Sequence, residues 1–168
     1  WHDSPLGRML LAANNAGLTG VWFDGEKYFA QYLELQHEEK DTSFLQQTKR
    51  WLDVYFSGKE PDFNIPLQFN GTDFQNEVWA MLCTIPYGQT TTYGEIAKRI
   101  AAKRGIPRMS AQAVGGAVGH NEISIIVPCH RVIGSNGSLT GYAAGLGKKI
   151  QLLTLEHVPV QLQKNFSF

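Results

Sequence analysis

The sequence lacks an apolar run of the about 18–20 residues that a membrane-spanning helix needs. Its first residues, Trp1-His2-Asp3, also lack the basic stretch and apolar core of a secretory leader, so we expect no signal peptide. Cysteine is scarce: Cys83 and Cys129 are the only two, and their spacing gives neither a disulfide framework nor a zinc motif. These absences argue against membrane proteins and disulfide-rich secreted domains, and they predict a reducing, cytoplasmic setting.

A net charge is also missing, because 15 Lys and Arg balance 15 Asp and Glu. The balance hides an asymmetry: residues 1–71 carry six basic and ten acidic residues, whereas residues 72–168 carry nine basic and five acidic ones. The whole molecule would attract nucleic acid only weakly, but a local basic surface in the second part is compatible with phosphate binding. Uneven surface charge without a partner explains the same numbers equally well.

The 168 residues, 43% of them hydrophobic and 18% charged, are typical of a globular protein with one large domain or two small ones. Residues 8–12 and 18–23 are apolar runs on either side of Asn14-Asn15-Ala16-Gly17. Because Asn and Gly readily adopt the positive φ of a tight turn, this pattern predicts two strands joined by a turn.

A helix is predicted from Thr42 or Ser43, either of which can cap it, to Phe56, with apolar residues at helical spacing. Residues 59–71 contain two prolines and a glycine, and we interpret them as a linker. Nothing before the linker clusters histidine, cysteine or acids. The first domain, residues 1–70, is therefore interpreted as scaffold.

The second part begins with a capping box, Thr72-Asp73-Phe74-Gln75, which predicts a helix through Ile85. Cys83 falls inside this helix, where a small buried hydrophobic role is expected. A second capping box, Thr92-Tyr93-Gly94-Glu95, predicts a short helix with Ile96 and Ile100 facing inward.

A third helix, residues 111–118, is predicted after the basic connector 103–108, with Ser110 as its cap and Gly119 at its end. Its two central glycines each cost about 1 kcal/mol relative to alanine, a cost that is accepted where another surface must approach the backbone. Two short helices of this kind suit a helix-turn-helix in a DNA groove. Tight packing against the protein core is the alternative, and the connector is longer than the usual turn.

The β-branched run Ile123-Ser124-Ile125-Ile126-Val127 is too short for a helix and predicts a buried strand. Pro128 ends it and leaves Cys129 at a strand end, where active sites often lie. The adjacent His130, the positive charge of Arg131 and the limited burial of a strand end all favour the nucleophilic thiolate. A free cysteine is more often buried and inert, which remains the alternative.

His130 follows Cys129 directly, and neighbours on an extended backbone point to opposite sides, so we expect a water to bridge them. An acid must then hold the imidazole in one tautomer. Glu156 is the best candidate, because it is the only acid in the helical stretch 148–156. A solvated carboxylate at a helix end is the alternative.

The stretch 133–147 contains five glycines besides Tyr142. Glycines let backbone groups approach a flat ligand, and the tyrosine ring offers a surface for stacking. Directly after a candidate nucleophile, we interpret this stretch as the wall of a pocket, although a plain surface connection has the same composition.

The run Pro128-Cys129-His130-Arg131-Val132, preceded by Asn121 and followed by the glycine-rich stretch with Tyr142, resembles the methylated-DNA–protein-cysteine methyltransferases, or O6-alkylguanine-DNA alkyltransferases. The resemblance is continuous from about Thr72 to Val158. It implies an α/β (α+β) fold: a ribonuclease H-like N-terminal domain, and a mostly helical domain over residues 71–160 with a helix-turn-helix and an active-site strand. Residues 161–168 would form a tail.

The resemblance also implies roles for single residues. Cys129 would accept the alkyl group, His130 would act through a water with Glu156 behind it, Asn121 would bond within the turn before the strand, and Tyr93 would rotate the nucleotide and donate a proton. The substrate pocket would include Tyr142, Ala143 (through its N–H), Val132 and Gly141. The implied DNA contacts are Thr92, Gly94, Ser110, Ala111, Gln112, Gly115, Arg131 and Ser135.

One position departs from the family's pattern: Gln112 stands where many members have an arginine that replaces the flipped base. Gln is shorter and neutral, so we expect flipping to persist with weaker retention of the opened duplex. The longer connector could add phosphate contacts through Lys103, Arg104 or Arg108. The zinc ligands of some members have no counterpart, and we expect no cofactor.

The expected function is repair of double-stranded DNA by a monomer that flips out O6-alkylguanine and transfers the alkyl group to Cys129. O4-alkylthymine stays open as a second substrate. The product would be a thioether, which water cannot hydrolyse, so the protein would be consumed. Two other hypotheses are a damage sensor without transfer activity and a thiol hydrolase using Cys129, His130 and Glu156. The sensor hypothesis fits poorly because relatives of that type replace the nucleophile, whereas Cys129 is present. The hydrolase hypothesis fits poorly because no oxyanion-hole motif accompanies the thiol.

Overall fold

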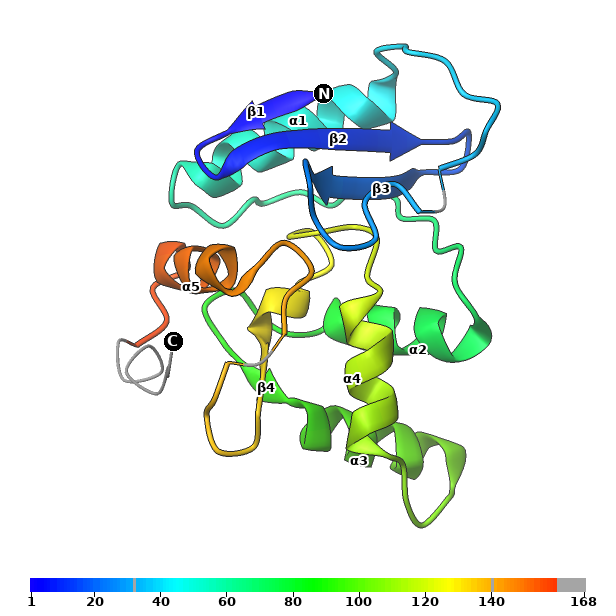
Figure 1. Ribbon diagram of the computed structural model, residues 1–168, viewed down its shortest axis with the longest axis vertical. Helices are drawn as coiled ribbons and strands as arrows, with labels where there is room; N and C mark the ends of the chain where they lie inside the picture. Colours follow the sequence, from blue (N-terminus) through cyan, green and yellow to red (C-terminus); the bar gives the residue numbers. More distant parts are fainter. Residues whose placement is uncertain (32, 140, 160–168) are drawn as a thin grey trace.

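The computed structural model describes residues 1–31, 33–139 and 141–159, and it has the mixed α/β architecture expected from the sequence (Figure 1). The predicted tail, residues 161–168, and residue 160 lie outside the described residues. In chain order the elements are β1 (His2–Ser4), β2 (Gly7–Ala13), β3 (Leu18–Phe23), α1 (Ser43–Phe56), α2 (Asp73–Leu82), β4 (Thr91–Thr92), α3 (Tyr93–Arg104), α4 (Ala111–Gly119), the 3-10 turn η1 (Cys129–Arg131), β5 (Val132–Ile133) and α5 (Leu146–Leu155).

The first part is a three-stranded antiparallel sheet in the order β1-β2-β3, with α1 packed against it (Figure 1). The predicted turn is present: the side chain of Asn14 accepts from the N–H groups of Ala16 and Gly17 at 2.8 and 3.1 Å. Thr42 caps α1 by accepting from the N–H of Leu45. Both predicted strands and the predicted helix are therefore confirmed.

The second part contains α2, α3 and α4 in mutual contact. The predicted capping residues are confirmed, since Thr72, Thr92 and Ser110 each accept from a backbone N–H at 3.1 Å. Helix α3 is longer than expected: it runs through Arg104 and ends at Gly105, whose φ of 66° is left-handed. The connector is thus residues 105–110, and it joins α3 to α4 as a helix-turn-helix pair.

One hydrophobic core runs through both parts. Sheet residues such as Met9 and Leu18 belong to the same buried cluster as Trp79 on α2 and Ile100 on α3. Strand β3 also meets the chain before Cys129 through the backbone, because the N–H of Val21 donates to the carbonyl of Glu122 at 2.8 Å. The sheet therefore supports the segment that carries the cysteine.

Two predictions about the second part are wrong. Cys83 is exposed and lies just past α2 as its C-cap, because the helix ends at Leu82 instead of reaching Ile85. Residues 123–127 are a series of turns instead of a strand, with only Ile123 forming a β-bridge, to Val21. In the described part of the chain, no helix is both long and apolar enough to cross a bilayer.

Candidate active site

Asn121 explains why the β-branched run does not form a strand. Its side-chain oxygen accepts from the N–H of Ile123 at 3.0 Å, and its amide donates to the carbonyl of Val127 at 2.9 Å. These bonds draw the two ends of the run together, and Ile125 adopts a left-handed φ of 71° within it. The same amide lies 3.2 Å from the sulfur of Cys129, so Asn121 fixes both the turn and the thiol.

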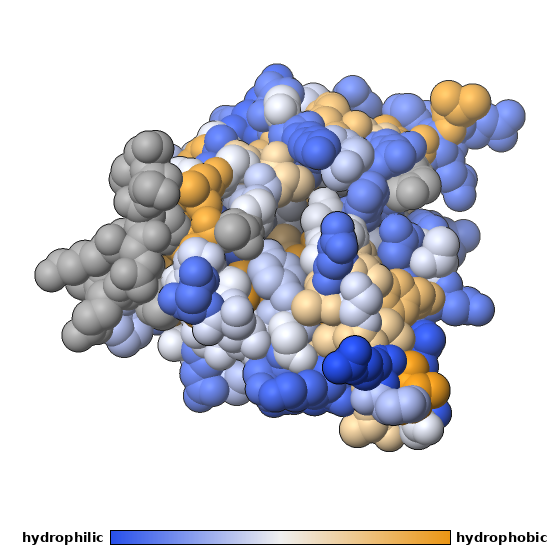
Figure 2. All heavy atoms as spheres, turned by 60° about the horizontal axis from the view of Figure 1, so that its bottom comes forward, coloured by the Kyte–Doolittle hydropathy of each residue, from blue (hydrophilic) through white to orange (hydrophobic). Residues whose placement is uncertain are grey.

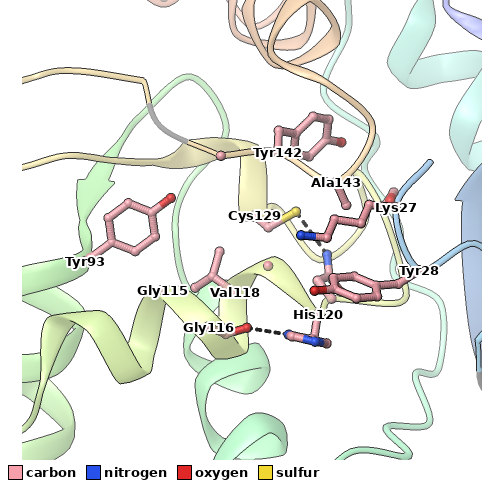
Figure 3. Close-up of a pocket in the computed structure, with 14 residues that line it drawn as sticks. Lys27, Tyr28, Tyr93, Gly115, Gly116, Val118, His120, Cys129, Tyr142 and Ala143 are labelled. Carbon is pink, nitrogen blue, oxygen red and sulfur yellow. Dashed lines mark hydrogen bonds between the residues drawn. The ribbon is translucent and has the colours of Figure 1, made fainter.

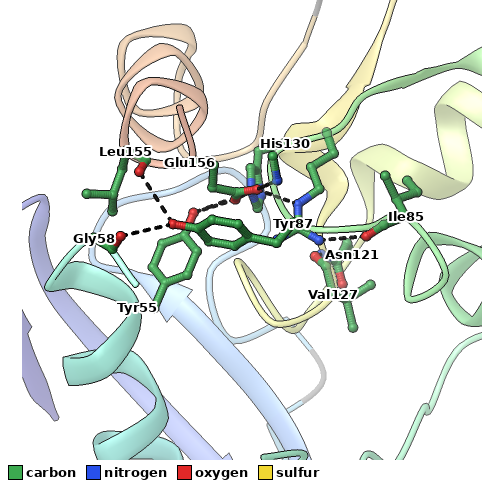
Figure 4. Close-up of polar contacts among 11 residues, drawn as sticks. Tyr55, Gly58, Ile85, Tyr87, Asn121, Val127, His130, Leu155 and Glu156 are labelled. Carbon is green, nitrogen blue, oxygen red and sulfur yellow. Dashed lines mark hydrogen bonds and ion pairs between the residues drawn. The ribbon is translucent and has the colours of Figure 1, made fainter. Parts of the chain in front are cut away.

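A buried polar network surrounds His130, which follows Cys129 in η1 (Figure 4). Both oxygens of Glu156 are occupied. Oε2 accepts from Nε2 of His130 and, at 2.6 Å, from the hydroxyl of Tyr55. Oε1 accepts from Nε of Arg131 at 2.7 Å and from the N–H of Gly88 at 3.1 Å. The carboxylate that the sequence assigned to His130 therefore contacts it.

The network keeps a charged carboxylate beside a neutral imidazole. Burial acts to raise the pKa of Glu156, but the hydrogen bond from His130, the attraction of that imidazole when it is protonated, and the hydrogen bond and charge of Arg131 outweigh it and lower that pKa to about 2. Burial lowers the pKa of His130 against the opposing effect of Glu156. Nδ1 of His130 has no hydrogen-bond partner among the described residues. With Nε2–H held by Glu156, Nδ1 is the nitrogen that can accept a proton.

The thiol of Cys129 is not activated at rest, contrary to the expectation from its neighbours. Only 7% of the residue is exposed, and burial raises the pKa of the thiol to about 11 despite the hydrogen bond from Asn121. We expected Cys129 to be partly exposed because it would follow the end of a strand. It is buried instead, because it begins a 3-10 turn that packs into the core. Ionisation of the thiol therefore requires a base.

A pocket with a cavity volume of about 420 Å³ opens in front of Cys129 (Figure 3). The C-terminal half of α4 forms one wall, and residues 141–143 form another. Gly115, Gly116 and Gly119 of α4 line the cavity, and a Cβ on Gly115 would make an ordinary contact of 3.7 Å with the ring of Tyr93. The lining residues are Lys27, Tyr28, Tyr93, Gly115, Gly116, Val118, Gly119, His120, Asn121, Ser124, Cys129, Gly141, Tyr142 and Ala143.

Two residues predicted at the ligand lie elsewhere. Val132 is fully buried in β5, where it pairs with Thr91, and it does not line the pocket. Arg131 was expected to contact DNA, but its guanidinium points inward, bonded to Glu156 and to the carbonyl of Ile85 at 2.7 Å. Arg131 points inward because it pairs with the buried carboxylate of Glu156, and its side chain is therefore not on the surface that would meet DNA.

The other predicted DNA contacts lie at the surface or partly buried near it. Ser110, Ala111 and Gln112 are exposed at the start of α4, and Ser135 is exposed after β5. Thr92 and Gly94 are half-buried at the start of α3. Figure 2 shows this side of the molecule, where hydrophilic residues surround an area of mildly apolar ones. Helix α4 therefore begins with small or polar exposed residues, and the exposed basic residues Lys103, Arg104 and Arg108 precede it in the sequence.

The first part was interpreted from the sequence as scaffold, but it contributes residues to the site. Lys27 and Tyr28 line the pocket, and Tyr55 contacts both Glu156 and, at 3.5 Å, Nε2 of His130. From the second part, Lys149 was also missed: its buried ammonium donates to the carbonyls of Val132 and Gly141 at 2.6 and 3.3 Å, and burial lowers its pKa to about 8. No local pattern marks these residues, because each acts across a long sequence separation. Within the described ranges, no cluster of three His, Cys, Asp or Glu could hold a metal ion.

Two family profiles match the chain over nearly its whole length. The ribonuclease-like domain of 6-O-methylguanine DNA methyltransferase matches residues 2–69, and the DNA binding domain of the same family matches residues 73–158. The chain belongs to this family. The resemblance seen in the sequence is thereby confirmed, and with it the class of enzyme, a methyltransferase that acts through a cysteine of its own.

Relatives of this methyltransferase agree in length. The methylated-DNA–protein-cysteine methyltransferase of Methanosarcina barkeri is 48% identical over 158 residues, covering 92% of this chain and 93% of the relative. That of Mycobacterium tuberculosis is 44% identical over 154 residues, covering 92% and 88%. The crystal structure of Mycobacterium tuberculosis OGT in complex with DNA superposes with a TM-score of 0.77 at 42% identity, covering 95% of this chain and 94% of that one. The fold class is confirmed.

Proposed function

We propose that this methyltransferase repairs double-stranded DNA by moving the alkyl group of O6-alkylguanine onto the sulfur of Cys129. The observation that carries the assignment is the position of Cys129, which lines the pocket on one side and adjoins the His130–Glu156 pair on the other. The exposed Cys83 has neither neighbour. A stacked base cannot reach a thiol buried in this way, so the nucleotide must leave the duplex and enter the pocket.

Helix α4 is the proposed DNA-binding element. Its exposed N-terminal residues, Ser110, Ala111 and Gln112, would enter the groove, while its C-terminal half forms the pocket wall. We infer that Gln112 fills the space left by the flipped base, with weaker retention than a charged, planar arginine would give. The solved structure of Mycobacterium tuberculosis OGT in complex with DNA, to which this chain is similar, supports this partner.

The proposed chemistry begins with the thiol protonated. His130 takes the proton of Cys129 through a water on Nδ1, and Glu156 stabilises the imidazolium that forms. The sulfur then bonds to the alkyl carbon as the carbon–O6 bond breaks, and the electron pair leaves with the guanine. A proton reaches the guanine from Tyr93, and the imidazolium of His130 gives up its proton to solvent while solvent returns one to the Tyr93 oxygen, so that in net balance the thiol proton of Cys129 ends on the base.

The product at Cys129 is a thioether. It has no carbonyl for water to attack and no good leaving group, so each molecule transfers once. We infer that residues 1–70 form one domain and residues 71–160 the alkyl-acceptor domain. Because the thiol must stay reduced, we also infer a cytoplasmic location.

The test is to incubate the protein with a duplex oligonucleotide containing O6-methylguanine and to map the adduct by peptide mass spectrometry. We expect one methyl per molecule, on the peptide that contains Cys129, and none in Cys129→Ser. Cys83→Ser is the matched control and should transfer like the parent protein. A methyl on Cys83, or repeated turnover, would contradict the assignment.

A further inference from the structure

Lys27 and Tyr28 form a strap that crosses from the first part of the chain to the pocket. The N–H of Lys27 donates to the carbonyl of Ala143 at 2.9 Å, which ties the strap to one wall. The ring of Tyr28 stacks on His120 with centroids 4.2 Å apart, which ties it to the other wall at the end of α4. His120 is itself held, since its Nδ1 donates to the carbonyl of Gly116 at 2.7 Å.

The backbone of Tyr28 has a left-handed φ of 64°, a conformation that is unfavourable for a tyrosine and that the contacts on both sides maintain. The strap is therefore fixed at the pocket rather than loosely draped over it. Figure 3 shows the Lys27 side chain extending from it, with the amine end directed toward the side of the pocket where Cys129 lies.

Lys27 brings the only formal charge to the cavity wall as far as the structure describes it: the other lining residues include no Lys, Arg, Asp or Glu. Its ammonium lies 5.1 Å from the ring centroid of Tyr28, and no ion pair with an acid is found for it within the described ranges. The neighbouring Glu26 does not cancel the charge, because burial raises the pKa of Glu26 to about 8 and keeps its carboxyl largely protonated at neutral pH.

The position of the reacting carbon determines whether the ammonium of Lys27 can contact the substrate. A carbon attacked by the sulfur of Cys129 must lie in contact with that sulfur, inside the pocket. A substituent longer than methyl extends from that carbon into the same cavity, where a single positive charge is available. A carboxylate there would meet an ammonium that has no acid partner among the described residues, and because Lys27 is exposed we expect the attraction of a solvent-exposed ion pair.

We propose that Lys27 makes the pocket select O6 substituents that carry a negative charge, such as carboxymethyl, over neutral substituents of the same size. The proposal rests on the proposed function of Cys129. Transfer follows the same balance: the bond from sulfur to the methylene carbon forms, the bond from that carbon to O6 breaks, and the thiol proton ends on the guanine. Lys27 touches the substituent and takes no part in the proton transfers.

The experiment measures single-turnover transfer at saturating protein on duplexes with O6-carboxymethylguanine and with O6-carbamoylmethylguanine, its neutral amide of matched size. Saturation removes differences in DNA affinity. Relative to the parent protein, we expect the ratio of the two rates to fall about two- to fivefold in Lys27→Gln, as for an exposed ion pair, and further in Lys27→Glu. Lys148→Gln is the control, because Lys148 lies over the ring of Phe23 and outside the cavity lining.

An unchanged ratio in both Lys27 variants, with folding verified by circular dichroism, overturns the proposal. Equal slowing on both substrates overturns it too, since it would assign Lys27 to pocket shape or to DNA phosphates. O6-methylguanine is assayed in parallel. Methyl transfer with an unchanged ratio rejects only the role of Lys27, whereas no methyl transfer by the parent protein rejects the proposed function itself.

Discussion

Two buried carboxyl groups, Glu26 and Glu156, differ in their charge states. Glu26, next to the strap, has one weak side-chain contact, to Ser124 at 3.5 Å, and burial raises its pKa to about 8. Glu156, in the interior, is 1% exposed and yet has a pKa of about 2. Partners decide the outcome: a carboxylate held by two cationic or imidazole groups stays charged, and one without them becomes neutral.

The site around Cys129 has a pocket side and an interior side. The pocket side of Cys129 offers neutral groups and one ammonium, which suits a ligand that arrives from solution. The interior side holds the hydrogen-bonded set of Glu156, His130 and Arg131, each at most 8% exposed. Cys129 lies between the two sides. Its neutral thiol lines the pocket, and the next residue, the proposed base His130, belongs to the interior set.

Glu156→Gln should produce the largest effect. The substitution leaves Arg131 buried without its counter-charge, and removal of one partner of a buried pair costs about 3–5 kcal/mol of unfolding free energy. His130 also loses the acceptor that fixes its tautomer, so transfer should slow by at least about a hundredfold. Urea denaturation and single-turnover transfer measure the two effects.

The pH dependence sharpens this prediction. The pKa of Glu156 is depressed in the folded state, so its contribution is present above the unfolded value of 4.5 and is lost as the pH falls through about 2. The stability difference between parent and Glu156→Gln should therefore shrink between these values. Glu95→Gln, at the exposed start of α3, is the control and should show no such change. A constant difference down to pH 2 would contradict the assigned charge.

Glu26→Gln should have the opposite sign. Since the pKa of Glu26 is raised in the folded state, the carboxyl destabilises the protein increasingly as the pH rises from 4.5 to about 8. A neutral amide removes that cost, so the variant should be about 3 kcal/mol more stable at pH 7 and similar to the parent below pH 4.5. Denaturation curves at both pH values test it, and a loss of stability at pH 7 would show that Glu26 is ionised.

Tyr55→Phe should cost about 2 kcal/mol, because the hydroxyl donates at 2.6 Å to a charged carboxylate that solvent cannot reach. Tyr87→Phe is the matched control, since that hydroxyl has only two long contacts, at 3.4 Å, to the carbonyls of Gly58 and Leu155. We expect thermal denaturation to show the larger loss for Tyr55. Equal losses would mean that the ring, not its bond to Glu156, matters.

Cys83→Ser should have the smallest effect, below about 0.5 kcal/mol, because the side chain is exposed at the end of α2. Transfer should be unchanged. A clear loss of stability in denaturation, or of alkyl transfer in adduct mapping, would show that the two thiols differ less than their surroundings indicate.

Local chemistry made much of the fold predictable. Helix starts followed from capping residues such as Thr72 and Ser110, and the first turn followed from Asn14, because each bonds to backbone within a few residues. The contact of His130 with Glu156 was predictable because Glu156 is the only acid in the helical stretch 148–156. These features need only short-range patterns or simple counting.

The errors arose where side-chain hydrogen bonds or burial in the core override the preference that a segment's composition indicates. The run 123–127 has the composition of a strand, but the bonds of Asn121 to both of its ends fold it into turns. Arg131 and the thiol were judged as though exposed, and burial in the shared core reversed both conclusions. Tyr55 carries no local signal, because its role exists only when α1 packs against the second part.

The bond between Tyr55 and Glu156 joins residues 101 positions apart, and this separation has a consequence for how the protein reaches its native state. Contacts that close so long a loop form late in folding, after local helices and hairpins. The proton-accepting network is then among the last parts to be completed. A chain cut between the two parts keeps Cys129, His130 and Glu156 in one piece but loses the Tyr55 hydroxyl from Glu156, so the complete network exists only in the finished fold.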